Sequence, residues 1–385
     1  MARHFLNVNA RNAQSSGLFT ADEYQKVVNY FRLPPGLSPT PLRRLTRLAK
    51  EFNIEDIWIK DESSRLGVSS FKIVGVRYAM SDLLNRGVLK RGSIVACATD
   101  GNHGHAVARM ARLSGLEAHV FVHAGTAPAR IQAIANEGAR VVPVDGNYDD
   151  SVRFASQEAQ RNGWVIVSDT AWSGYDAIPR QIMAGYTVIM EEAVSDWGER
   201  IPDVVIVQAG VGGFLCAVVS WFCHKYGTSR PYLISCESTE AACVLESVRA
   251  GEPVTIPGKL NTMMAGLSAG RISSITFPIL ASALDACVAL EDEWSANAMR
   301  LLAHPRSPDP AVVSGESGAC GLAALLAILK DEDLAGLRKA SGISPASVVM
   351  IINTEGATDP LNYSRIVGQG RPDLRDLGIH SQLPE

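Results

Sequence analysis

The chain has 385 residues, more than a single hydrophobic core usually holds, so two domains are the first expectation. Apolar residues make up 46% and charged residues 20%, as in an ordinary globular protein, and the formal net charge is −4. This charge balance gives no indication of a nucleic-acid partner or of binding to an anionic membrane.

Short β-branched runs alternate with amphipathic helical patterns along most of the chain. Strands are predicted at residues 56–59, 93–98, 118–122, 140–144, 164–168, 203–208, 232–236, 286–290 and 347–353. Helices are predicted at residues 127–137, 149–161, 178–192 and 214–225. Nearly all-apolar strands in such an alternation are typical of open, mostly parallel sheets covered on both faces. The sequence therefore predicts an α/β protein that binds its ligands where strands lead into helices.

The first of four polar junctions runs from Lys60 to Lys72, where a polar loop after a strand ends at the start of an apolar helix. The positive end of the helix dipole repels an ammonium, which favours a neutral amine able to form a Schiff base. Lys72 is therefore a candidate nucleophile. This junction alone leaves open the alternative of a surface lysine.

The second junction, residues 98–105, directly follows a strand. Its glycines let the backbone approach a ligand, Asn102 can hydrogen-bond a phenolate, and Asp100 can transfer protons. His103 and His105 have no third ligand at a suitable spacing, so no metal site is predicted. A glycine turn capped by an aspartate is the alternative interpretation.

The third junction, Gly210-Val211-Gly212-Gly213, lies between a strand and a helix. Backbone N–H groups in such a loop, with a helix N-terminus, form a phosphate site. The loop is not a dinucleotide fingerprint, because Leu215 stands where that motif requires glycine. A tight turn without a ligand is the alternative.

The fourth junction follows the strand at 347–353. The Thr354 hydroxyl can hydrogen-bond a ring nitrogen without protonating it, although a threonine in a turn is common.

The seven cysteines form no C-x-x-C pair, and most lie inside apolar runs, which indicates reduced core residues. No apolar run is long enough for a signal peptide or a membrane span. We therefore expect no membrane association and a cytoplasmic location.

In this order the four junctions resemble those of the fold-type II pyridoxal-phosphate (PLP) enzymes, the tryptophan synthase β-subunit-like superfamily. Within it, segments such as Asp100-Gly101-Asn102-His103-Gly104 and Ser314-Gly315-Glu316-Ser317-Gly318 are most similar to those of the diaminopropionate ammonia-lyases. The resemblance implies two α/β domains with PLP in the cleft between them, and a homodimer. The larger domain would comprise residues 1–74 and 193–385, and the smaller domain residues 75–192.

The resemblance also assigns site residues. The catalytic residues implied are Lys72 and Asp100, one base on each face of the substrate, and Asp169 near the substrate amine. The cofactor-binding residues implied are Phe71, Lys72, Asn102, Gly210, Val211, Gly212, Gly213 and Thr354. The substrate-binding residues implied are Ser70, Asp100, His103, Asp169 and Tyr175, and Arg271 is predicted as a further one because it departs from the family pattern.

Two departures from the lyase pattern concern the substrate. Ser69-Ser70 precede Phe71-Lys72 where the lyases carry Asn-Ala, and Arg271 stands near the position of a lyase glutamate. A guanidinium suits an anionic group, such as the side chain of 3-hydroxyaspartate. A solvent-exposed Arg271 is the alternative.

The predicted function is PLP-dependent β-elimination that converts 2,3-diaminopropionate to pyruvate and ammonia. The alternative is a serine, threonine or 3-hydroxyaspartate dehydratase, or a β-replacement enzyme. A non-catalytic ligand-binding regulator is disfavoured, because an inert relative would be expected to have lost Lys72 or Asp100.

Overall fold

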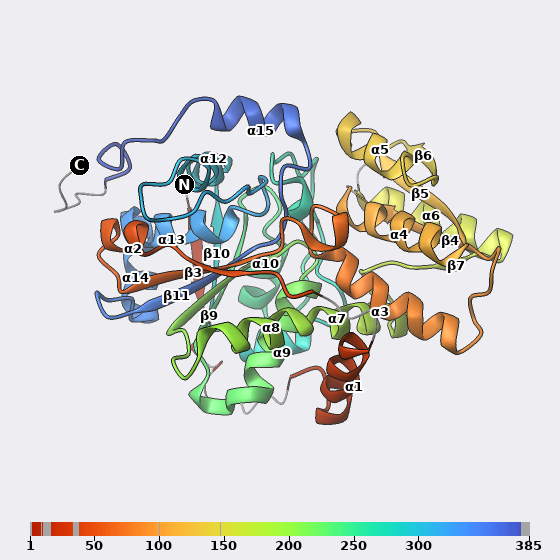
Figure 1. The fold of residues 1–385 in the computed structure, drawn as a ribbon, viewed down its shortest axis with the longest axis horizontal. Helices are drawn as coiled ribbons and strands as arrows, with labels where there is room; N and C mark the ends of the chain where they lie inside the picture. The colour runs from red at the N-terminus through yellow and green to blue at the C-terminus, as the bar shows by residue number, and fades with distance from the viewer. Residues whose placement is uncertain are drawn as a thin grey trace.

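The computed structural model describes residues 2–8, 10, 17–33, 38–99, 101–146 and 148–378, and these form two lobes, each built on one sheet (Figure 1). The larger lobe holds a seven-stranded sheet of order β1-β10-β9-β8-β11-β3-β2. Its strands are β1 (Arg3–Leu6), β2 (Leu42–Arg44), β3 (Asp56–Asp61), β8 (Val204–Gln208), β9 (Tyr232–Ser238), β10 (Ala286–Leu290) and β11 (Val348–Asn353). The five central strands are parallel, and only β1 and β2 pair antiparallel.

The smaller lobe, coloured yellow in Figure 1, holds a four-stranded parallel sheet of order β6-β5-β4-β7. Its strands are β4 (Ile94–Thr99), β5 (Glu117–His123), β6 (Arg140–Val144) and β7 (Val165–Ile166). The predicted limits of the smaller domain, residues 75–192, enclose all four strands. The limits themselves stay a prediction.

Helices cover both faces of each sheet. They are α1 (Ala21–Arg32), α2 (Thr46–Glu51), α3 (Lys72–Asn85), α4 (Asn102–Ser114), α5 (Pro128–Ala135), α6 (Tyr148–Asn162), α7 (Ala177–Tyr186), α8 (Val188–Trp197), α9 (Gly213–Tyr226), α10 (Cys243–Ala250), α11 (Phe277–Ala283), α12 (Asp292–Ala303), α13 (Cys320–Lys330), α14 (Ala335–Ser341) and α15 (Pro360–Val367). The alternation of side chains in β8 shows the layering: Val205 and Val207 join the apolar cluster that includes α9, and Val204 and Ile206 join the cluster that includes α13.

The structure confirms the predicted α/β class and each predicted strand, with small shifts at the ends. It adds β1 and β2, edge strands of four and three residues that are too short for a sequence pattern. The helix predicted at 178–192 is wrong as a single element, because the chain forms α7 and α8 with Thr187 between them. The cysteines are buried and free, as expected. Among the described residues, no helix is long and apolar enough to cross a membrane.

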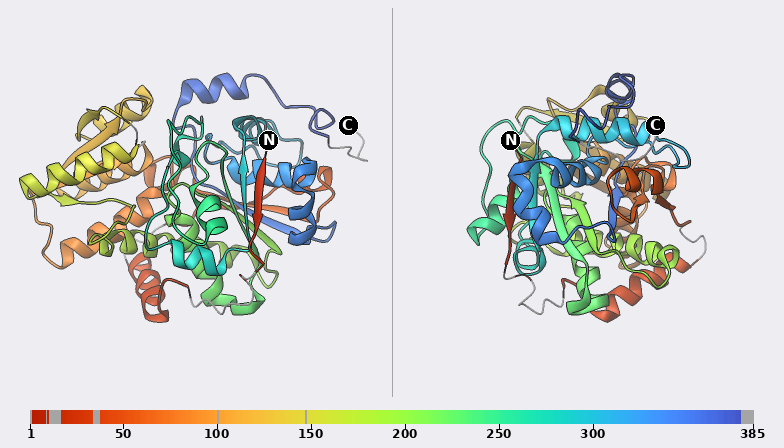
Figure 2. Two further views of the ribbon diagram at one scale, coloured as in Figure 1. Left: turned by 180° about the vertical axis from the view of Figure 1, so that it is seen from behind. Right: turned by 90° about the vertical axis from the view of Figure 1, so that its left-hand side faces the viewer.

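Helix α3 connects the lobes and packs against α4 and α7, while α1 lies beneath the junction in the view from behind (Figure 2). Glycine allows the close crossing of α3 and α7. A Cβ atom on Gly75 would lie 2.5 Å from the Ile182 carbonyl oxygen, and one on Gly185 would lie 2.9 Å from the Gly75 Cα. This crossing holds the N-terminus of α3 at the cleft between the two sheets.

Candidate active site

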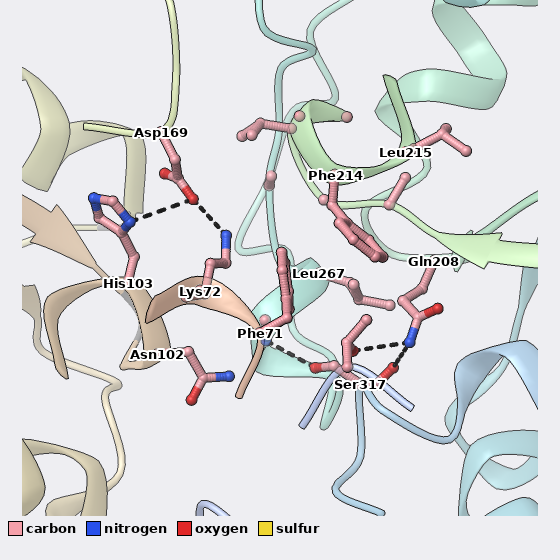
Figure 3. Close-up of a pocket in the computed structure, with 18 of the residues that line it drawn as sticks. Phe71, Lys72, Asn102, His103, Asp169, Gln208, Phe214, Leu215, Leu267 and Ser317 are labelled. Atoms are coloured by element: carbon pink, nitrogen blue, oxygen red, sulfur yellow. Dashed lines mark hydrogen bonds and ion pairs between the residues drawn. The ribbon is translucent and has the colours of Figure 1, made fainter. Parts of the chain in front are cut away.

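The four polar junctions converge on one cavity between the lobes (Figure 3). They meet because the carboxyl ends of β3, β8 and β11 lie side by side in one sheet, and the loop after β4 faces them from the other. The lining residues that the sequence analysis singled out are Phe71, Lys72, Asn102, His103, Asp169, Gly210, Val211, Gly212, Gly213 and Thr354.

Lys72 is the first residue of α3, and its side chain points into the cavity rather than along the surface. Its ammonium pairs with the Asp169 carboxylate and lies 5.3 Å from the centre of the Phe71 ring. The amide of Phe71 donates to the Thr354 carbonyl oxygen at 3.1 Å, which ties the start of α3 to the end of β11. The lysine is therefore held between two junctions.

His103 and Asp169 form a second layer behind Lys72. His103 Nε2 donates to the Val167 carbonyl oxygen at 2.8 Å, so this nitrogen carries a proton. His103 Nδ1 then faces Asp169 Oδ2 at 3.7 Å. Burial raises the pKa of the Asp169 carboxyl, but His103 and Lys72 outweigh it and bring the pKa to about 2. Asp169 is therefore anionic at any ordinary working pH.

Gln208 lies at the side of the cavity away from His103 and Asp169 (Figure 3), and Thr354 also lines the cavity. Gln208 Nε2 donates to the Thr354 hydroxyl oxygen at 2.8 Å and to the Ile352 carbonyl oxygen at 2.9 Å. Because the Thr354 oxygen accepts this bond, its own hydrogen is available to an acceptor in the cavity. A ring nitrogen that receives such a hydrogen bond stays unprotonated.

Asn102 begins α4 and donates to one oxygen of Glu355, whose other oxygen accepts the Ser317 amide at 3.0 Å. The second hydrogen of the Asn102 amide is then available to an anionic oxygen in the cavity. Glu355 and Ser317 were not predicted as site residues. Their sequence signal is weak, because each is one polar residue in a polar turn.

The glycine segment forms the back of the cavity. Gly212 has φ +89°, and a Cβ atom on it would lie 3.1 Å from the Thr276 hydroxyl oxygen, so only glycine fits without strain. Among the described residues, the N–H groups of residues 211–215 make no hydrogen bond at this helix start. Unpaired donors at a helix N-terminus fit a phosphate. With Lys72 able to bind a carbonyl, the residues present fit PLP.

The structure places three other predicted residues away from this cavity. The Tyr175 hydroxyl donates to the Ile166 carbonyl oxygen at 3.0 Å and accepts the Ser168 amide at 2.9 Å, so it holds the segment before Asp169. Ser70 is buried and pairs through its backbone with Glu355. Arg271 lines a separate cavity. Asp100 lies outside the described residues.

Tyr148 and Gln208 line the reaction cavity but were not predicted as site residues. Gln208 had one usable signal, a polar residue at the buried carboxyl end of an apolar strand. Tyr148 had none, because only the packing of α6 against the loop after β7 brings it there: its hydroxyl lies 3.3 Å from the Thr170 hydroxyl oxygen.

Two open, mostly parallel sheets, with a lysine in the cleft and an anion site at the start of a helix, are the architecture of fold-type II PLP enzymes. The family model for pyridoxal-phosphate dependent enzymes matches residues 33–354. The diaminopropionate ammonia-lyase of Escherichia coli K12 is 35% identical over 94% of this chain and 95% of its own length. The diaminopropionate ammonia-lyase of Salmonella typhimurium LT2 is 34% identical over 90% of this chain and 92% of its own length.

Solved structures lead to the same family as the sequence comparisons. The crystal structure of the E. coli diaminopropionate ammonia-lyase in complex with an aminoacrylate–PLP azomethine reaction intermediate superposes with a TM-score of 0.89. It shares 34% identity and covers 96% of this chain and 97% of its own. The chain belongs to the pyridoxal-phosphate dependent enzymes and, within them, to the diaminopropionate ammonia-lyase family. The predicted fold class and cofactor are thereby confirmed.

Proposed function

We propose that this enzyme eliminates ammonia from 2,3-diaminopropionate and releases pyruvate and a second ammonia after hydrolysis, with one water consumed. The observation that carries the proposal is the contact of Lys72 with an anionic Asp169 in the cavity of a chain 35% identical to the E. coli lyase. An amine leaves poorly unless it is protonated, and a carboxylate beside it stabilises the ammonium form.

Each site residue has a proposed role. PLP, when bound, withdraws electrons from the substrate Cα and makes its proton acidic. Lys72 binds the cofactor through its side-chain nitrogen and moves the Cα proton on one face. Asp100 is proposed as the base on the opposite face. Asp169 holds the β-ammonium group, and His103 lies against Asp169 Oδ2.

The remaining roles concern binding. Thr354 donates to the ring nitrogen, Asn102 to the phenolic oxygen, and residues 210–213 to the phosphate. Tyr175 acts through the backbone of the segment that carries Asp169. Phe71 and Ser70 support the start of α3. Among the described residues, Arg271 lines another cavity, so its position does not favour an anionic substrate over diaminopropionate.

A pyruvate-release panel over D- and L-diaminopropionate, serine, threonine and 3-hydroxyaspartate tests the proposal. We expect the highest kcat/KM with diaminopropionate. A higher kcat/KM with 3-hydroxyaspartate or with serine would contradict the ammonia-lyase assignment and indicate a dehydratase.

Asp169→Asn is expected to lower kcat/KM for diaminopropionate by about 10²–10⁴-fold, because the amide keeps the size of the side chain and removes its charge. The cofactor absorbance should remain, since Asp169 is not needed to hold PLP. The exposed Asp176 provides the control, and Asp176→Asn should retain the full rate. A rate unchanged in Asp169→Asn would exclude the proposed role.

Gly212→Ala is expected to weaken PLP binding at least about tenfold, because a side chain at φ +89° is strained and would meet the Thr276 hydroxyl at 3.1 Å. Titration of the apoenzyme with PLP, followed by absorbance, measures the change. Gly251 also has a positive φ, +75°, but open space around it, so Gly251→Ala is the matched control and should bind PLP normally. Equal affinities in the two variants would place the phosphate elsewhere.

The proposal includes a cytoplasmic homodimer, supported by the family resemblance. Light scattering of the holoenzyme is expected to give about twice the chain mass of 41.3 kDa. A mass equal to that of one chain would contradict it.

A further inference from the structure

A second cavity, of about 870 Å³, lies beside the reaction cavity and shares none of its lining residues. One wall is α6, another is the loop from Thr170 to Ser173, and the third comes from residues 253–274 of the larger lobe. The proposed reaction and the proposed cofactor use none of these residues. Arg271 was predicted to bind substrate, but it lies in this second cavity and not in the reaction cavity.

The two cavities are separated by a thin wall. Tyr148 and Asp169 face the reaction cavity, and their chain neighbours Asp149 and Thr170 face the second one. A hydrogen bond connects this wall to the larger lobe, because the Ala171 amide donates to the Ser273 hydroxyl oxygen at 2.9 Å. A ligand in the second cavity would therefore contact both lobes. It would also contact Thr170, the residue that directly follows Asp169 in the chain.

Two opposite charges in this cavity have no direct partner. Among the residues that the structure describes, neither the Asp149 carboxylate nor the Arg271 guanidinium makes a hydrogen bond or an ion pair. By contrast, Arg153 in the same cavity pairs with Asp150 at 2.6 Å. A partly buried carboxylate without a partner is unfavourable, and the exposed Arg271 guanidinium is open to an anion, so the two groups suit a ligand with charges of its own.

Asp149 lies against the segment that carries Arg271. A Cβ atom placed on Gly270, the residue before Arg271, would lie 3.1 Å from Asp149 Oδ2. Burial raises the pKa of the Asp149 carboxyl, Asp150 raises it further, and Arg153 and Arg271 lower it. Trp172, whose ring stacks on Tyr175 at 4.2 Å, supplies an apolar wall between α6 and the larger lobe.

We propose that this second cavity binds a free α-amino acid as its zwitterion. Arg271 binds the carboxylate, Asp149 binds the ammonium, and the side chain of the ligand packs against Trp172. A simple anion would be repelled by Asp149, and a simple cation by Arg271, so only a ligand that carries both charges matches the pair. A guanidinium can also grip a carboxylate through two parallel hydrogen bonds.

The test uses the holoenzyme after borohydride reduction, because the reduced cofactor cannot exchange with an amino acid in the reaction cavity. Binding of isotope-labelled L-alanine is measured by equilibrium dialysis. We expect one saturable site per chain. Unlabelled glycine should displace the label, whereas pyruvate and ethylamine, each with only one of the two charges, should not.

Variants separate the two cavities. Asp149→Asn and Arg271→Gln are each expected to weaken alanine binding at least about tenfold. Asp169→Asn makes the same chemical change in the reaction cavity and should bind alanine like the wild type. Arg153→Gln, which changes a paired arginine of the same cavity, should also bind normally. Arg271 is exposed, so its variant tests the site even if Asp149→Asn fails to fold.

Three outcomes would overturn the proposal. The first is the absence of saturable binding to the wild type. The second is binding that is lost in Asp169→Asn but kept in Arg271→Gln, which would place alanine in the reaction cavity. The third is displacement by pyruvate as effective as that by glycine, which would show a simple anion site. None of them bears on the ammonia-lyase reaction, because the measured quantity is binding to a reduced, inactive enzyme.

Discussion

Lys72→Ala is expected to lower pyruvate formation from diaminopropionate by at least about 10³-fold, because one side chain both binds the cofactor and moves the Cα proton. The variant should also lose the covalent link that borohydride reduction produces in the wild type. The physical basis is the position of Lys72, at the start of α3 and in contact with Asp169.

Peptide mapping of the reduced wild type provides the measurement, with the label expected on the peptide that contains Lys72. Lys90 is exposed and does not line the cavity, so Lys90→Ala is the control and should keep full activity. A label on any other lysine would refute the assignment.

Glu192→Ala is expected to reduce the free energy of unfolding by about 3–5 kcal/mol, because it leaves a buried cation without its partner. Lys60, Glu62, Arg65 and Glu192 form a neutral cluster with side chains between 0% and 7% exposed. Lys60 Nζ lies 2.8 Å and Arg65 Nη2 2.5 Å from Glu192 Oε2. The cluster ties α8 to the loop that leads to Lys72, so PLP binding should weaken as well.

Denaturant unfolding of the apoenzyme measures the stability change, and PLP titration measures the change in cofactor affinity. Glu199, an exposed residue after the end of α8, gives the matched control, and Glu199→Ala should change stability by no more than about 0.5 kcal/mol. A loss below about 1 kcal/mol in Glu192→Ala would mean that water reaches the cluster and screens its charges.

Local patterns were sufficient for the parallel strands and for the polar junctions that follow them, while the cofactor contacts assigned to those junctions stay a prediction. The run from Val204 to Val207 is apolar on both faces because β8 is buried on both faces, and the glycines that follow it lie where the strand turns into α9. The same patterns were insufficient for β1 and β2, since strands of four and three residues carry too few side chains to show an alternation.

The sequence by itself determined which polar residues stand at the carboxyl ends of strands, because burial imposes an apolar pattern that breaks off where each strand ends. Only the tertiary structure decided which of them meet. The strand order β8-β11-β3 brings Thr354 beside Gln208 through hydrogen bonds between segments far apart in the chain, and no local pattern contains that order. Arg271 shows the same limit: its neighbours are set by the packing of α6 against the larger lobe, and this packing places it in the second cavity.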